Sequence, residues 1–125
     1  MRLKEFDTQI YPCKLAVAII KDNSDLKKIN ELYTYIDGTK IIWEDFVHKA
    51  EVVRVNKKGI KNEHFILIVF NKPYFTCSVI AHESFHAAAG IFSKIGETNL
   101  DCEPCAYLIE WIADCCWSMK KKKHG

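Results

Sequence analysis

The sequence has no hydrophobic run long enough to cross a membrane. The apolar run at residues 65–70 (FILIVF) is far shorter than the roughly 20 residues that a membrane-spanning helix needs. The chain opens on charged and mixed polar residues, and its first apolar run, residues 15–20, is too short and too late for a signal-peptide core. We therefore expect a cytoplasmic protein without a membrane partner.

An excess of charge of one sign is also missing. Lysine and arginine number 18 and aspartate and glutamate 16, so the net charge is only +2 and gives no whole-protein field that would attract nucleic acid. The one local excess is the lysine run at residues 120–123, and we expect residues 120–125 to form a solvated, disordered basic tail. Nucleic acid is therefore not the expected partner, although salt-dependent DNA binding by this tail is a testable alternative.

The composition is that of one globular domain. The chain has 125 residues, of which 49% are hydrophobic and 27% charged, and this length suits a single core over residues 1–119. Six cysteines are present. Without a secretory signal they are expected to be free thiols rather than a disulfide framework.

The hydrophobic pattern predicts an α+β fold. A β-branched apolar run predicts a buried strand at residues 13–21, and helical spacing predicts a helix that Ser24 caps and residues 37–38 end. Two strands joined by a turn near residues 56–62 follow. Thr76 or Ser78 caps a helix that ends near residue 94 with Gly96 just beyond, and Asp101 caps a last helix that ends near residue 119. This order favours a small, mainly antiparallel sheet packed against the two C-terminal helices.

The segment CSVIAHESFHAAAG, residues 77–90, contains an H-E-x-x-H motif. On a helix, His82 and His86 project from nearly the same line one turn apart, so both imidazoles can bind one Zn²⁺. Glu83 lies beside that line, where it contacts the metal's water rather than the metal. The motif therefore predicts a zinc site with a free carboxylate next to it.

A catalytic zinc needs a third protein ligand and an open fourth position. Glu103 begins the last predicted helix, 17 residues after His86, and a reversing loop at residues 96–101 would let that helix run back with its first turn near the motif. We expect Glu103 to be the third ligand. Glu110 shares its helix face and remains an alternative.

The stretches VIAHESFHAAAGIF and EPCAYLIEWI together resemble the small HExxH zincins of the gluzincin type. The resemblance covers roughly residues 50–119, and it is nearer to short zincin-like proteins of phages and mobile elements than to ImmA/IrrE-type peptidases. It implies that His82, His86 and Glu103 bind zinc and that Glu83 is the general base. It also implies an edge strand beside the active-site helix.

The cysteines that flank Glu103 define a rival site. Cys102 and Cys105 form a CxxC, and two thiolates with His82 and His86 would make a closed, structural Cys₂His₂ site. Glu83 would then have no catalytic role. In that case the protein would be a zinc-binding interaction module without hydrolytic activity.

If the site is catalytic, the expected reaction is zinc-dependent hydrolysis of a peptide or protein substrate. Glu83 would take a proton from water and deliver it to the leaving amine. Tyr107 is the first candidate for stabilising the oxyanion, with Tyr74 and His64 as alternatives. The strand at residues 63–70, if at the sheet edge, would hold an extended peptide by strand addition.

Overall fold

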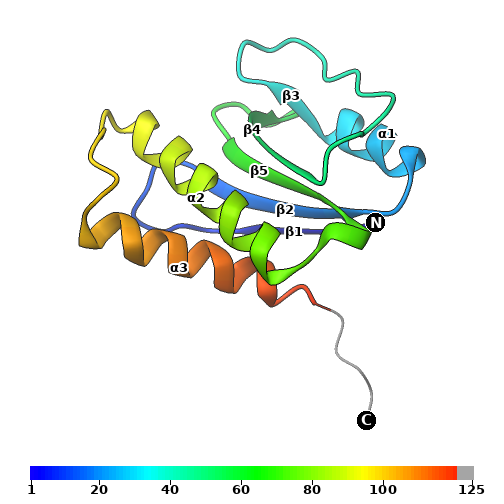
Figure 1. The fold of residues 1–125 in the computed structure, drawn as a ribbon. Helices are drawn as coiled ribbons and strands as arrows, with labels where there is room; N and C mark the ends of the chain where they lie inside the picture. Colours follow the sequence, from blue (N-terminus) through cyan, green and yellow to red (C-terminus); the bar gives the residue numbers. More distant parts are fainter. Residues whose placement is uncertain (121–125) are drawn as a thin grey trace.

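The computed structural model describes residues 1–120 and contains one five-stranded sheet and three α-helices (Figure 1). The strands lie in the order β1-β2-β5-β4-β3. Their bounds are β1 Arg2–Phe6, β2 Lys14–Ile20, β3 Tyr33–Tyr35, β4 Ala50–Lys57 and β5 His64–Asn71. Only β2 and β5 pair in parallel, and the other three pairs are antiparallel. The α+β prediction with a mainly antiparallel sheet is confirmed.

The predicted edge position of residues 63–70 is wrong, because β5 is the central strand. It pairs with β2 on one side and with β4 on the other along its whole length. The sequence of β5 agrees with this, since it buries six consecutive residues and a strand covered on both faces needs such a continuous apolar run. Strand addition therefore cannot take place on β5.

The open edge near the motif belongs to β4 instead. Its last residues pair with β3, from Tyr35 opposite Val55 to Tyr33 opposite Lys57. Within residues 1–120, no strand pairs with the outer side of residues 50–54. Backbone N–H and C=O groups along such an edge are free to pair with another chain.

The start of α1, the end of α1 and the start of α3 differ from the prediction, whereas α2 begins as predicted. Asp22 caps α1 (Asn23–Leu32), through its side chain, in place of Ser24, and α1 ends before the short strand β3 rather than at residue 37. Thr76 caps α2 (Cys77–Lys94) as predicted. Cys102, not Asp101, precedes α3 (Glu103–Trp117), and its side chain makes no capping bond. Gly96 follows α2 with φ 79°, the left-handed conformation expected there.

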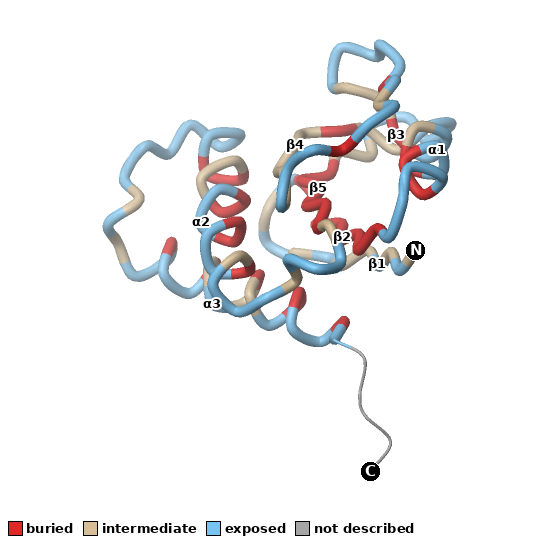
Figure 2. Tube along the Cα trace, turned by 45° about the vertical axis from the view of Figure 1, so that its right-hand side comes forward, coloured by how far each residue is buried: buried red, intermediate tan, exposed pale blue. Residues whose placement is uncertain are grey.

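Helices cover both faces of the sheet, and the alternation of side chains in the strands divides the core in two. Leu15, Val17 and Ile19 of β2 point toward α2 and α3, whereas Ala16, Ala18 and Ile20 point toward α1. The short 3-10 helix Lys72–Tyr74 links β5 to α2. Figure 2 shows α2 with buried residues along one side and exposed residues along the other. Among residues 1–120, no helix is both long and apolar enough to span a bilayer.

Candidate functional site

His82 and His86 lie together on the exposed side of α2, one helical turn apart. Their Nε2 atoms are 3.2 Å from each other. Two nitrogens bound at about 2.0–2.1 Å to one tetrahedral zinc would be about 3.3 Å apart. The separation of the two nitrogens is therefore close to that of two ligands of one zinc ion.

Glu83 is one of only three polar or charged residues of the described chain that are buried. It is 8% exposed, and its Oε1 atom is 3.9 Å from Nε2 of His82. The position follows from helix geometry, since residue 83 is rotated by 100° from residue 82 toward the sheet. The carboxylate is thus held beside the two imidazoles by the packing of α2.

A cleft of about 360 Å³ opens next to this group, between α2 and the start of β4. Its lining comes from Lys49, Ala50, Ser78, Val79, His82 and Glu83. Lys49 is the only lysine or arginine among these lining residues. Its ammonium lies 5.6 Å from the ring centre of Tyr74. Sequence reasoning missed Lys49 because residues 39–50 carry no clear periodicity, and pairing with the motif depends on where β4 begins.

Glu103 does not join the histidines in this structure. Helix α2 continues for eight residues beyond His86 to Lys94, about 12 Å along the axis, before the chain turns back into α3. The motif on α2 lies beside the C-terminal part of α3, because the hydroxyl of Ser84 lies beside Cys116. Glu103 precedes Cys116 by 13 residues, or about 20 Å along α3, and therefore lies at the opposite end of the helix pair (Figure 1).

The thiols of the predicted Cys₂His₂ site are also far from the histidines. Cys102 precedes α3 and points its Sγ atom at the carbonyl of Asn99, 3.4 Å away, and Cys105 is fully buried in the core. Burial raises the pKa of Cys105, and the neighbouring Cys102 raises it further. Within residues 1–120, no group of three or more His, Cys, Asp or Glu side chains is placed to hold a metal ion.

The three candidates for the oxyanion group occupy different places. Tyr107 is on α3, 65% exposed, and does not line the cleft. His64 begins β5 and lies against Asn56, at the far end of the sheet. Tyr74, 42% exposed, is nearest to the cleft through its contact with Lys49.

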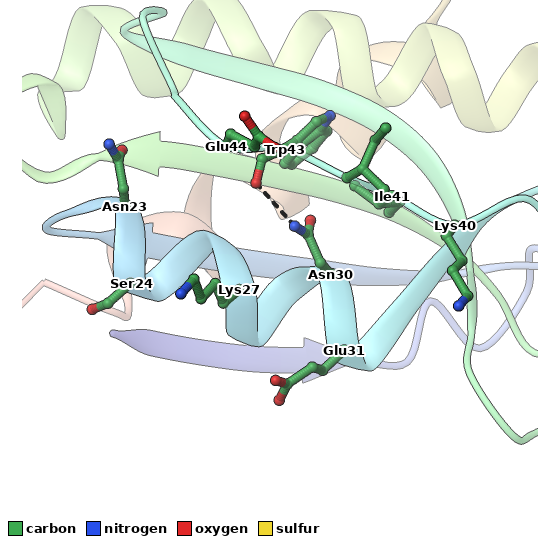
Figure 3. A pocket seen from close by; sticks show the side chains of 10 residues that line it. Asn23, Ser24, Lys27, Asn30, Glu31, Lys40, Ile41, Trp43 and Glu44 are labelled. Atoms are coloured by element: carbon green, nitrogen blue, oxygen red, sulfur yellow. Dashed lines mark hydrogen bonds between the residues drawn. The ribbon is translucent and has the colours of Figure 1, made fainter.

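A larger cavity than this cleft lies on the other face of the sheet. It measures about 690 Å³ and lies between α1 and the segment at residues 40–44 (Figure 3). Asn30 lines the cavity and donates a hydrogen bond to the carbonyl of Trp43, 2.9 Å away. The lining contains Lys27, Glu31 and Glu44 but no histidine or cysteine, so it offers no metal-binding group comparable with the motif.

Comparison with known proteins gives no relative to guide the assignment: no family model, no curated protein and no solved structure matches the chain.

Proposed function

We propose that the protein is a zinc-dependent metallopeptidase whose site is built on α2. The observation that carries the proposal is the 3.2 Å separation of the His82 and His86 Nε2 atoms, which suits two bonds to one tetrahedral zinc. The carboxylate of Glu83 lies 3.9 Å from Nε2 of His82, and both residues line a cleft of about 360 Å³. Two imidazoles for the metal and a free carboxylate for the water's proton are two of the components of metal-assisted amide hydrolysis.

The chain's own residues supply three functions in this proposal. A zinc ion bound to the two imidazoles would polarise the peptide carbonyl and lower the pKa of water toward 7. Glu83 would act as the general base that accepts a proton from the attacking water and as the acid that returns it to the leaving amine. Lys49 also lines the cleft, and its ammonium would stabilise negative charge that develops on the carbonyl oxygen.

The third protein ligand stays a prediction. Catalytic zinc sites usually have three protein ligands, and Glu103 would reach the histidines only if the start of α3 moved along α2. The proposal therefore rests on His82, His86 and Glu83. Glu103, Glu110 and the two flanking thiols are tested separately by their effects on zinc affinity.

The substrate proposed is an extended peptide bound along the open edge of β4. Residues 50–54 have no strand on their outer side in the described chain, and Ala50 lies in the same cleft as Glu83. A peptide that adds a strand here would obtain main-chain hydrogen bonds and bring one of its amide bonds to the motif.

The variant Glu83→Gln tests the assignment of the base. It should bind zinc as the parent protein does but lower the hydrolysis rate by about 10²–10⁴-fold, the usual contribution of a positioned base. The measurement is cleavage of a mixed library of quenched fluorescent hexapeptides, with zinc content determined in parallel. Glu31→Gln, in the cavity on the α1 face, is the matched control and should cleave at the parent rate. Zinc binding without cleavage by the parent protein would instead assign the pair to a non-catalytic zinc site.

A further inference from the structure

A basic pocket lies at the other end of the open edge of β4. It measures about 260 Å³, and two cations, Arg54 and Lys94, line it together with His64 and apolar groups. None of its lining residues is aspartate or glutamate. The pocket is therefore positive in charge, with an apolar wall that lowers the local dielectric constant.

Within the described part of the chain, residues 1–120, no carboxylate forms an ion pair with the cations of this pocket. Arg54 donates one hydrogen bond from Nη2 to the carbonyl of Gly90, 3.3 Å away, and a guanidinium has five N–H donors. Neither Arg54 nor Lys94 has a carboxylate within 4.0 Å among residues 1–120. The two cations also act on the neighbouring thiol of Cys13. Burial raises the pKa of this thiol, and the positive charges of Lys94 and Arg54 partly offset the rise.

The pocket and the cleft at the motif lie a fixed distance apart along the open edge of β4. Ala50 lines the cleft of Glu83, and Arg54 is the last residue of β4 before its outer side is paired with β3. Four residues of extended chain span about 13 Å. Four is an even number, so residues of an added strand opposite Ala50 and Arg54 would point to the same face, the one covered by α2.

We propose that this pocket, formed by Arg54 and Lys94, binds an acidic side chain of the extended peptide, about four residues from the bond that lies at Glu83. The inference rests on the proposed function for the place of the bond, but not for the binding itself. Charge complementarity selects the occupant, because two unpaired cations in a site without carboxylates favour a carboxylate over a neutral group. The strand edge selects a peptide rather than a free anion, because its main-chain groups pair with an extended chain.

Peptide binding by the zinc-loaded Glu83→Gln protein tests the proposal without cleavage. The probes are fluorescein-labelled, C-terminally amidated nonapeptides in which a single Asp replaces Asn at each position in turn, and the readout is fluorescence anisotropy. One position should show Asp binding roughly tenfold tighter than Asn, the gain expected from two partly exposed charge pairs together. That preference should disappear in the further variant Arg54→Gln/Lys94→Gln.

Matched variants separate this pocket from the general charge of the protein. Lys27→Gln/Lys40→Gln removes two cations from the cavity on the α1 face and should keep the preference for Asp. Arg54 also contacts α2, so Lys94→Gln alone is the variant that leaves that contact intact; it should lose part of the preference. Arg54→Lys, which keeps the charge, should retain most of it.

The outcomes distinguish this inference from the proposed function. A preference for Asp that persists without zinc and is lost in the Arg54/Lys94 variant supports the pocket even if no hydrolysis is found. Hydrolysis without any preference for Asp, or a preference that survives the loss of both cations, overturns it. A preference for a free C-terminal carboxylate over an acidic side chain, seen with non-amidated Asn peptides, also overturns the assignment.

Discussion

The two faces of the sheet carry cavities of opposite kinds. The α1 face has the larger one, about 690 Å³, lined by lysine, asparagine, glutamate and tryptophan side chains (Figure 3). The cleft on the α2 face has about half that volume, but His82 and the buried carboxylate of Glu83 line it, and His86 lies one turn from His82 with its Nε2 atom 3.2 Å from that of His82. The difference teaches that the size of a cavity does not identify a reactive site, whereas the placement of titratable groups does.

Zinc affinity gives the sharpest test of this comparison. His86→Ala should lower it by more than about 100-fold, because even the outer hydrogen-bond partners of metal ligands contribute about 10–100-fold. His48→Ala is the control: His48 is exposed and packs beside Phe46 of the core on the α1 face, so its removal should leave affinity unchanged. Titration calorimetry measures both.

The same titration tests whether Glu103 and the flanking thiols contribute to zinc affinity. Glu103→Ala and the double variant Cys102→Ser/Cys105→Ser should both bind zinc as the parent does, because α3 holds these residues away from the histidines. A loss in Glu103→Ala as large as that in His86→Ala would contradict the observed arrangement and restore the ligand set that the sequence predicts.

Matched core substitutions test whether the two faces are stabilised independently. Ile29 in the α1 core and Ile91 in the α2 core are both fully buried, so Ile29→Val and Ile91→Val should each lower the free energy of unfolding by about 0.5–1.5 kcal/mol. Since the sheet separates them, the double variant should show the sum to within about 0.5 kcal/mol. Urea unfolding provides the measurement, and a larger deviation would mean that the two cores are coupled.

The rate of thiol alkylation is expected to show the smallest effect. It reports on the α2 face alone, because the buried cysteines of the described chain all lie in the core on that face. Burial raises the pKa of Cys116 to about 12 and that of Cys115 to about 11, so few thiolates are present at pH 8 and neither should react quickly with iodoacetamide. Cys77 is exposed and should be alkylated first, as mass spectrometry of the digested protein would show. Equal rates would indicate that α3 separates readily from the sheet.

The features predicted well from the sequence depend on local chemistry. The capping hydroxyl of Thr76, the glycine after α2 and the stacking of His82 over His86 follow from the residues within one or two helical turns. The position of Glu83 beside the histidine line follows in the same way, whereas its burial depends on which side of α2 packs on the sheet.

The features predicted poorly depend on distances between elements. Strand β1, residues Arg2–Phe6, has three charged residues out of five and gave no signal, yet its pairing with β2 helps to make β5 central. The place of Glu103 depends on how far α2 extends past His86. Nothing in the ligand spacing itself determines that length, so the sequence supported a three-ligand site that the helix pair does not assemble.

The length of α2 thus determines how far the start of α3 lies from the histidines. Eight residues, a little more than two helical turns, separate the second histidine from the end of the helix. Whole turns preserve the direction in which side chains face, so a chain with a shorter α2 would bring the start of α3 closer to the imidazoles without rotating them. In the protein as it stands, the extra turns keep the side of the histidine pair that faces away from the sheet open to a ligand from outside.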